Sequence, residues 1–231
     1  MIYRYETQMN KFPVSQCAKV GVRESLEYYK SLGYDGVFIT NHFLGGNINL
    51  EHRTGSYDDR VHFYFSDYEE GARIADEVGI RVFPGVELTG EEGTDYLIYG
   101  LDKQWYLDHP EIEHMKATQK LSLLMQSGAL VVQAHPYREA NYIDHIRLFP
   151  RSVHGVEVIN ALSKDFENDM ARHYADAYGL LHFAGSDNHR ASGQRRLAGM
   201  CAQTPIKDAA DFAERVLKNE MSVFVLDADN P

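Results

Sequence analysis

Short apolar runs alternate with amphipathic stretches along most of the chain. The runs Gly36–Thr40 and Ala129–Ala134 are almost continuous in apolar residues, which is typical of short strands buried on both faces. Between such runs, Val22–Leu32 carries apolar residues at helical spacing, and Gly33 follows it where a helix commonly ends. This alternation predicts parallel β/α units joined by right-handed crossovers.

The same pattern covers nearly the whole chain. The predicted strands are short apolar or alternating runs: Ile2–Gln8, Gly36–Thr40, Ile80–Leu88, Asp95–Gly100, Ala129–Ala134, Gly155–Ile159, Gly179–Ala184 and Met221–Leu226. The predicted helices are amphipathic and mostly end at glycine: Val22–Leu32, Ser66–Val78 with a capping-box pattern, Glu111–Gln126, Asn141–Phe149, Phe166–Tyr178 and Ala209–Leu217. About seven such units favour a single α/β domain over residues 1–231, closed as a distorted barrel, with a doubly wound sheet as the runner-up.

Composition narrows the class of protein. The formal net charge is −11, which does not favour a basic groove for nucleic acid. No apolar run is long enough to cross a bilayer, and the first residues do not resemble a signal peptide. The two cysteines do not make a disulfide framework. We therefore expect a cytoplasmic protein without a membrane partner, for which nucleic acid is an unlikely substrate.

A carboxylate and an imidazole follow the apolar run Gly179–Ala184. Asp187 and His189 stand two residues apart after Gly185, so both side chains can face one cavity. This is a usual way of presenting two ligands to a divalent metal. The alternative is a turn in which Asp187 caps the next helix and His189 lies on the surface.

Other candidate ligands also stand at the ends of predicted strands. His42, Glu87 and His135 each end or follow a strand, as do Gln8 with Asn10, and Asn160. In a β/α barrel the carboxyl ends of the strands share one rim, so these side chains should converge there. Imidazole and carboxylate are ligands of zinc, manganese and iron, and such metals suit phosphoester hydrolysis.

Five segments resemble the PHP (polymerase and histidinol phosphatase) superfamily, and they occur in that family's order over nearly the whole chain. They are Ile39–His42, Gly85–Glu87, Ala134–Pro136, Val156–Asn160 and Gly185–His189. The resemblance implies a distorted (β/α)7 barrel with two or three divalent metal ions (zinc, manganese or iron) and phosphoesterase activity. It also implies that Glu87 bridges two metals, that Asp187 binds one and His135 the other, and that His42 and His189 serve a third.

The chain departs from this family at its amino end. The family's His-x-His motif aligns with Gln8 and Asn10. An amide oxygen is a weaker ligand for zinc-like ions than imidazole, so the metal that Asp187 shares should bind poorly. The family's Thr-Asp-His is Thr-Asn-His here, at Asn41, which we expect to act outside the ligand set. The chain is therefore either a weakened enzyme or a catalytically silent relative.

Three further features are candidates for the site. Arg138 could bind a phosphate because its guanidinium matches phosphate oxygens, although a surface arginine is the alternative. Cys17 could complete the third metal site or be a partly buried free thiol. His154 precedes a strand, which favours a structural role; it would be a ligand of the second metal if the strand starts elsewhere. The polar stretch Gly45–Tyr64 is long for a loop and should shape specificity.

The sequence thus predicts a metal-dependent phosphoesterase that cleaves a phosphomonoester of a small molecule, in the manner of a histidinol phosphatase. A metal-bound hydroxide would attack phosphorus, with Glu87 and His135 holding one metal, His42 and His189 another, and Arg138 the phosphate. The alternatives are a silent metal- or ligand-binding relative and a metal-dependent amidohydrolase. The sequence leaves the oligomeric state open.

Overall fold

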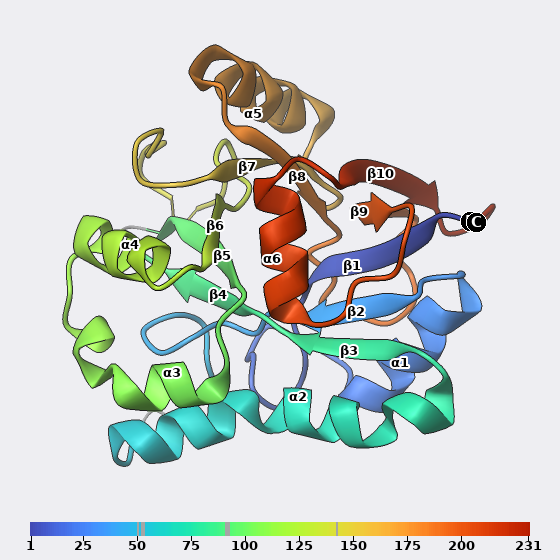
Figure 1. The fold of residues 1–231 in the computed structure, drawn as a ribbon, viewed down its shortest axis with the longest axis horizontal. Helices are drawn as coiled ribbons and strands as arrows, with labels where there is room; N and C mark the ends of the chain where they lie inside the picture. The colour runs from blue at the N-terminus through green and yellow to red at the C-terminus, as the bar shows by residue number, and fades with distance from the viewer. Residues whose placement is uncertain (50, 52–53, 91–92, 142) are drawn as a thin grey trace.

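The strands form two five-stranded sheets (Figure 1). The computed structural model describes residues 1–231 except 50, 52–53, 91–92 and 142. The first sheet has the order β10-β9-β1-β2-β3 and consists of β1 (Tyr3–Met9), β2 (Gly36–Ile39), β3 (Arg81–Pro84), β9 (Arg196–Ala202) and β10 (Ser222–Asp227). The second follows chain order and consists of β4 (Val86–Thr89), β5 (Asp95–Tyr99), β6 (Leu130–Gln133), β7 (Gly155–Asn160) and β8 (Leu181–Gly185).

The strands are not all parallel, which corrects the prediction of uniform β/α units. Strands β1, β2 and β3 pair in parallel, and so do β6, β7 and β8. However, β5 runs antiparallel to both β4 and β6, and β9 runs antiparallel to β1 and β10. For β4 and β5 the reason is local, because only five residues separate the two strands, too few for the crossover that parallel neighbours need.

The two sheets meet at two isolated bridges. Met9 pairs with Asn188 after β8, and His42 pairs with Glu87 of β4, both in parallel. Across the described residues the strands nevertheless form two sheets, and no closed barrel is detected. The predicted strand Ile80–Leu88 is in fact two strands in different sheets, divided at Gly85. A Cβ at this position would lie 2.7 Å from Thr40 Cγ2, so only glycine fits the crossing.

The helices are α1 (Val22–Ser31), α2 (Tyr57–Val78), α3 (Lys103–Asp108), α4 (Ala117–Gln126), α5 (Asp165–Tyr178) and α6 (Ala209–Leu217), and Pro110–Glu113 is a 3-10 turn. Helix α2 begins well before the predicted Ser66, because Ser56 and Asp59 form the capping box instead. The predicted helix Glu111–Gln126 is divided into the 3-10 turn and α4. The helix predicted over Asn141–Phe149 is wrong: its described residues are not helical.

Helix α6 covers the ends of the two sheets that lie away from the bridges (Figure 1). Its Phe212 packs against Phe38 of β2, with ring centroids 4.4 Å apart, and against Tyr99 of β5 at 5.3 Å. All three side chains are fully buried in one cluster that draws on both sheets. Burial of such a side chain stabilises a core by about 3–5 kcal/mol relative to alanine. This cluster thus packs the two sheets against each other. None of the helices in the described part of the chain has the length and apolar character needed to cross a bilayer.

Candidate metal centre

A cavity of about 540 Å³ opens where the two sheets meet. Of the predicted residues, those that line it are His42, Glu87, His135, Arg138, Asp187 and His189. Gln8 and Asn10 are fully buried beside it, and both contact the Glu87 carboxylate. The structure therefore brings all eight predicted site residues together, although they come from five segments of the chain.

Two imidazole nitrogens face Glu87 without a hydrogen-bond partner. His42 Nδ1 lies 3.6 Å from Glu87 Oε2, and His135 Nε2 lies 3.6 Å from Glu87 Oε1. Both nitrogens are buried, and neither has a hydrogen-bond partner in the structure. Buried polar atoms are nearly always satisfied, so such a pair on either side of a carboxylate is well suited to hold a cation.

Asp95 belongs to the same group, although the sequence did not single it out. Its Oδ2 lies 3.8 Å from His135 Nε2, and one ligand atom from each of His42, Glu87 and Asp95 lies within 4.8 Å of the others. Burial and the neighbouring Glu87 carboxylate raise the pKa of Asp95. Since both effects oppose its negative charge, a cation here would relieve them.

Glu87 carries its charge in spite of being buried. Burial alone would raise its pKa, but the imidazoles of His42 and His135 lower it below the usual value. The same pairing acts on His42: burial alone would lower the pKa of its imidazole, whereas the Glu87 carboxylate and Cys17 raise it to about 10. The group of imidazoles and carboxylates formed by His42, Glu87, Asp95 and His135 is called the imidazole–carboxylate corner below.

A second group is made of amides, a guanidinium and a carboxylate. Gln8 Nε2 and Asn10 Nδ2 each donate a 3.0 Å hydrogen bond to a different oxygen of Glu87. Arg138 donates to Asp187 Oδ2 at 2.5 Å, and Asn160 donates to Gln8 Oε1 at 3.1 Å. These residues, Gln8, Asn10, Arg138, Asn160 and Asp187, are called the amide–guanidinium corner.

The amide–guanidinium corner satisfies its own negative charge. Burial alone would raise the pKa of Asp187, but the Arg138 guanidinium and the imidazoles of His189 and His135 outweigh it, and the pKa lies well below its usual range. Arg138 also donates to Asn160 Oδ1 at 3.0 Å, which orients its guanidinium over the carboxylate. The corner therefore presents N–H groups and a fixed cation to Glu87 and Asp187, and it fits a metal ion poorly.

The backbone is strained where two of these side chains are placed. His135 has φ 27° and Asp187 has φ 53°, and among the described residues only Asn219 is another non-glycine residue with positive φ. Such conformations are costly and cluster at functional sites. Gly185 precedes Asp187 by two residues, and a Cβ there would lie 2.7 Å from Glu157 Oε1. The sequence Gly185–His189 is thus shaped to turn Asp187 and His189 into the cavity.

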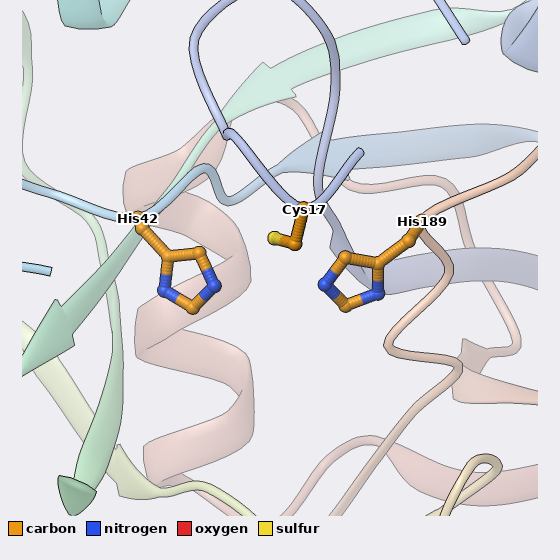
Figure 2. Close-up of side chains that lie close together, drawn as sticks. All are labelled: Cys17, His42 and His189. Atoms are coloured by element: carbon orange, nitrogen blue, oxygen red, sulfur yellow. The ribbon is translucent and has the colours of Figure 1, made fainter. Parts of the chain in front are cut away.

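Cys17, His42 and His189 make a third group, on the other side of His42 (Figure 2). One ligand atom from each lies within 4.8 Å of the others, and the two imidazole centroids are 6.5 Å apart. Burial alone would raise the pKa of the Cys17 thiol, but hydrogen bonding to His189 and His42 lowers it to about 7. The sequence had left Cys17 open between a ligand and a free thiol; the structure places it among imidazoles.

Two other predicted features lie differently. His154 precedes β7, and its Nδ1 accepts a hydrogen bond from the backbone of Val131, away from the cavity. Of the stretch Gly45–Tyr64, residues Gly45, Gly46 and Asn47 line the cavity, whereas Tyr57–Tyr64 belong to α2. The loop is therefore shorter than expected, and residues 50 and 52–53 lie outside the described part.

Comparison with solved structures relates the fold to several proteins. A two-domain protein from Bacteroides vulgatus that contains a predicted PHP-like metal-dependent phosphoesterase aligns with a TM-score of 0.67 at 14% identity, over 97% of this chain and 65% of that one. An amidohydrolase from Chromobacterium violaceum aligns with a TM-score of 0.58 at 14% identity, over 95% and 97%. The lesion-specific endonuclease PfuEndoQ from Pyrococcus furiosus aligns with a TM-score of 0.59 at 11% identity, over 97% and 58%.

The chain has the fold of PHP-like phosphoesterases. It spans about two thirds or less of the two-domain protein and of the endonuclease. No protein-family model matches the sequence, and no curated protein does. The comparisons agree with the PHP-like fold that the sequence resemblance implied, although they do not confirm the (β/α)7 barrel.

Proposed function

We propose that this protein is a metal-dependent phosphoesterase of the PHP type that hydrolyses a phosphomonoester of a small molecule. The observation that carries the proposal is the pair of buried imidazole nitrogens, His42 Nδ1 and His135 Nε2, each 3.6 Å from Glu87 and without a hydrogen-bond partner. Together with Asp95 they form a set of nitrogen and oxygen ligands that suits zinc, manganese or iron.

The residues that line the cavity would have different roles in the reaction. We assign His42, Glu87, Asp95 and His135 as the ligands of a divalent ion, which when bound supplies Lewis-acid activation and neutralises charge on the phosphoryl group. Arg138 lines the cavity, and Asp187 and Asn160 hold its guanidinium in place. It would orient the phosphate oxygens, because a guanidinium matches their geometry.

We infer that this site works with fewer metal ions than the family pattern implies. Gln8 and Asn10 donate hydrogen bonds to both oxygens of Glu87, and Arg138 neutralises Asp187. A cation at this corner would have to displace those contacts and would face the guanidinium at close range. A catalytically silent relative is the second candidate, favoured by the same replacement of two imidazoles by amides.

The volume of the cavity and the net charge of the protein favour a small substrate. The cavity has about 540 Å³, which is in the range of small-molecule sites. A net charge of −11 gives weak attraction for a polyanion such as DNA, although an endonuclease shares the fold. Both cysteines are free, which agrees with a cytoplasmic location.

A substrate panel tests the proposal. The purified chain, stripped of metal and then supplied with Mn²⁺ or Zn²⁺, is assayed on p-nitrophenyl phosphate, on a p-nitroanilide amide and on a DNA duplex with an abasic site. Metal-dependent release of phosphate from the first substrate alone supports the proposal. Turnover of the amide alone assigns an amidohydrolase, cleavage of the duplex alone assigns a nuclease, and no turnover with metal bound assigns a silent relative.

A further inference from the structure

The cavity has a second kind of lining beside its ion-binding side chains. The part that neither the two corners nor the group of Cys17 and His189 supplies is called the polar wall below. It consists of Gly45, Gly46 and Asn47 after β2 and of Thr89 and Gly93 at the connection from β4 to β5. The polar wall adjoins the imidazole–carboxylate corner, because Thr89 Oγ1 donates a 2.7 Å hydrogen bond to Asp95 Oδ1. A phosphate held at that corner would leave the rest of a substrate within reach of the polar wall.

The segment that carries Asn47 is held in place by the loop after β1. Ser15 pairs with Ile48 in an isolated antiparallel bridge, and the backbone N–H of Gln16 donates a 2.9 Å hydrogen bond to the backbone oxygen of Asn47. Ile48 is buried in the core, so the neighbouring Asn47 side chain points the opposite way and lines the cavity. In the described part of the chain this exposed amide makes no side-chain hydrogen bond, so it is available to a ligand.

The polar wall presents hydrogen-bonding groups to the cavity. A Cβ at Gly46 would lie 2.5 Å from Thr89 Oγ1, so the wall is bare backbone at this point. The Asn47 amide can both donate and accept, and Thr89 Oγ1, which donates to Asp95, can still accept. Among the described residues that line the cavity, none has an aliphatic side chain or a phenyl, phenol or indole ring. Small-molecule sites usually have many such side chains, so this lining favours a ligand rich in hydroxyl groups.

We propose that the substrate is a phosphomonoester of a short polyol or a sugar, whose hydroxyl groups hydrogen-bond to Asn47 and to the backbone of the polar wall. This substrate class rests on the proposed function, since it assumes that the cavity hydrolyses a phosphomonoester. The oxygen of water bonds to phosphorus, the bond between phosphorus and the ester oxygen breaks, and the ester oxygen takes the proton that water loses. The products are inorganic phosphate and the free polyol or sugar. An apolar alcohol of the same length would leave the groups of the polar wall unpaired in the complex.

Two esters that differ only in hydroxyl groups test the substrate class. Glycerol 3-phosphate and n-propyl phosphate have the same carbon chain, and phosphate release from each is measured with the metal-loaded protein. We expect kcat/KM to be at least about tenfold higher for the glycerol ester, because its two hydroxyl groups gain hydrogen bonds. Asn47→Leu should lower this ratio by about fivefold and keep turnover of the propyl ester. Gln104→Leu, a comparable change of an exposed amide on α3, should leave the ratio unchanged.

The outcomes separate the substrate class from the reaction. A wild-type ratio of one or below, with both esters hydrolysed, overturns the substrate class and supports phosphomonoester hydrolysis. If neither ester is hydrolysed with metal bound, the proposed function fails, and isothermal titration of the same two esters decides the rest. Tighter binding of the glycerol ester supports a wall that binds hydroxyl groups, whereas equal binding overturns it. Thermal unfolding shows whether Asn47→Leu is folded, and an unchanged ratio in the folded variant overturns the role of Asn47.

Discussion

The buried negative charge of Glu87 has different neighbours on its two sides. On one side, His42, Asp95 and His135 surround the carboxylate with polar atoms that lack hydrogen-bond partners or repel it. On the other side, Gln8 and Asn10 donate hydrogen bonds to it. The first arrangement leaves two buried imidazole nitrogens without a hydrogen-bond partner, whereas the second already supplies Glu87 with two donors, although Asn10 Oδ1 is itself buried without a partner.

The comparison shows why a count of histidines and carboxylates alone does not tell where a cation would fit. Asp187 is a carboxylate at the rim, as a ligand should be, yet Arg138 lies 2.5 Å from it and supplies the positive charge. A residue's suitability as a ligand therefore depends on whether its charge is already paired. Variants that disrupt one corner at a time test whether the other corner responds.

The largest effect should follow from Glu87→Gln. The variant removes the charge that both corners share, so a divalent ion should bind weakly and phosphoesterase activity should fall by roughly a thousandfold, as expected when a metal's Lewis-acid contribution of several kcal/mol is lost. Metal content and kcat/KM are the measurements. Glu139→Gln, an exposed glutamate, is the matched control. If Glu87→Gln retained both metal and activity, the imidazole–carboxylate corner would not be the catalytic centre.

Arg138→Met should have the next largest effect, on stability. It leaves the carboxylate of Asp187, whose side chain is 1% exposed, buried without its cation. Loss of one partner of a buried ion pair costs about 3–5 kcal/mol. Chemical denaturation at neutral pH measures this change. Arg138→Met/Asp187→Asn, which removes both charges, should recover most of the loss. Equal instability of the single and double variants would show that Arg138 matters for packing rather than for charge.

The pH dependence of stability should differ between the wild type and the double variant Arg138→Met/Asp187→Asn. The folded-state pKa of Asp187 lies below its unfolded value, so its contribution is full above the unfolded pKa and is lost as pH falls through the folded one. The wild type should therefore lose stability relative to Arg138→Met/Asp187→Asn only in acid, below about pH 4. Denaturation midpoints at pH 3 and pH 7 give the comparison, and a constant difference at both would contradict it.

The sequence located the rim residues because strand ends are marked in it. Each of His42, His135 and Asp187 stands within two residues of a short apolar run or its glycine, so any fold with parallel strands there brings them together. The prediction of the site did not need the correct sheet topology. That topology could not be read, because an apolar run such as Asp95–Tyr99 has the same pattern whether it pairs in parallel or antiparallel fashion.

Asp95 was missed for this reason. Because β5 runs antiparallel to β4, its first residue, not its last, lies at the rim beside Glu87. An antiparallel β5 would have pointed to Asp95 from the sequence. The prediction of where α2 begins was wrong for a different reason. The pairs Ser56 with Asp59 and Ser66 with Glu69 both match a capping box. Val61 and Tyr64 lie between the two pairs and are buried in the core, so the helix begins at the first.

Asp95→Asn should weaken the imidazole–carboxylate corner without abolishing it. It removes one negative charge but keeps the size of the side chain and the hydrogen bond from Thr89. Loss of one ligand charge should reduce affinity for Mn²⁺ by about 10–100-fold, comparable to the loss of a supporting partner at a metal site. Isothermal titration measures it. Asp102→Asn, which changes a helix cap outside the cavity, is the control. Unchanged affinity in Asp95→Asn would remove Asp95 from the ligand set.

The smallest effect should come from Gln8→His/Asn10→His, which gives the amide–guanidinium corner imidazoles like those of the imidazole–carboxylate corner. Two imidazoles would replace the amides that donate to Glu87, so the corner would lose hydrogen bonds and gain lone pairs. Arg138 would still neutralise Asp187, and its positive charge would oppose an added cation. We therefore expect a weakly held extra zinc ion and an activity gain of about tenfold or less. Metal content after dialysis and kcat on p-nitrophenyl phosphate test this.

Adding Arg138→Met to the histidine pair should make the extra ion bind tightly, because it removes the competing positive charge. A tight extra ion with Arg138 in place would show that the guanidinium moves aside, and that histidine loss alone separates this chain from the family pattern.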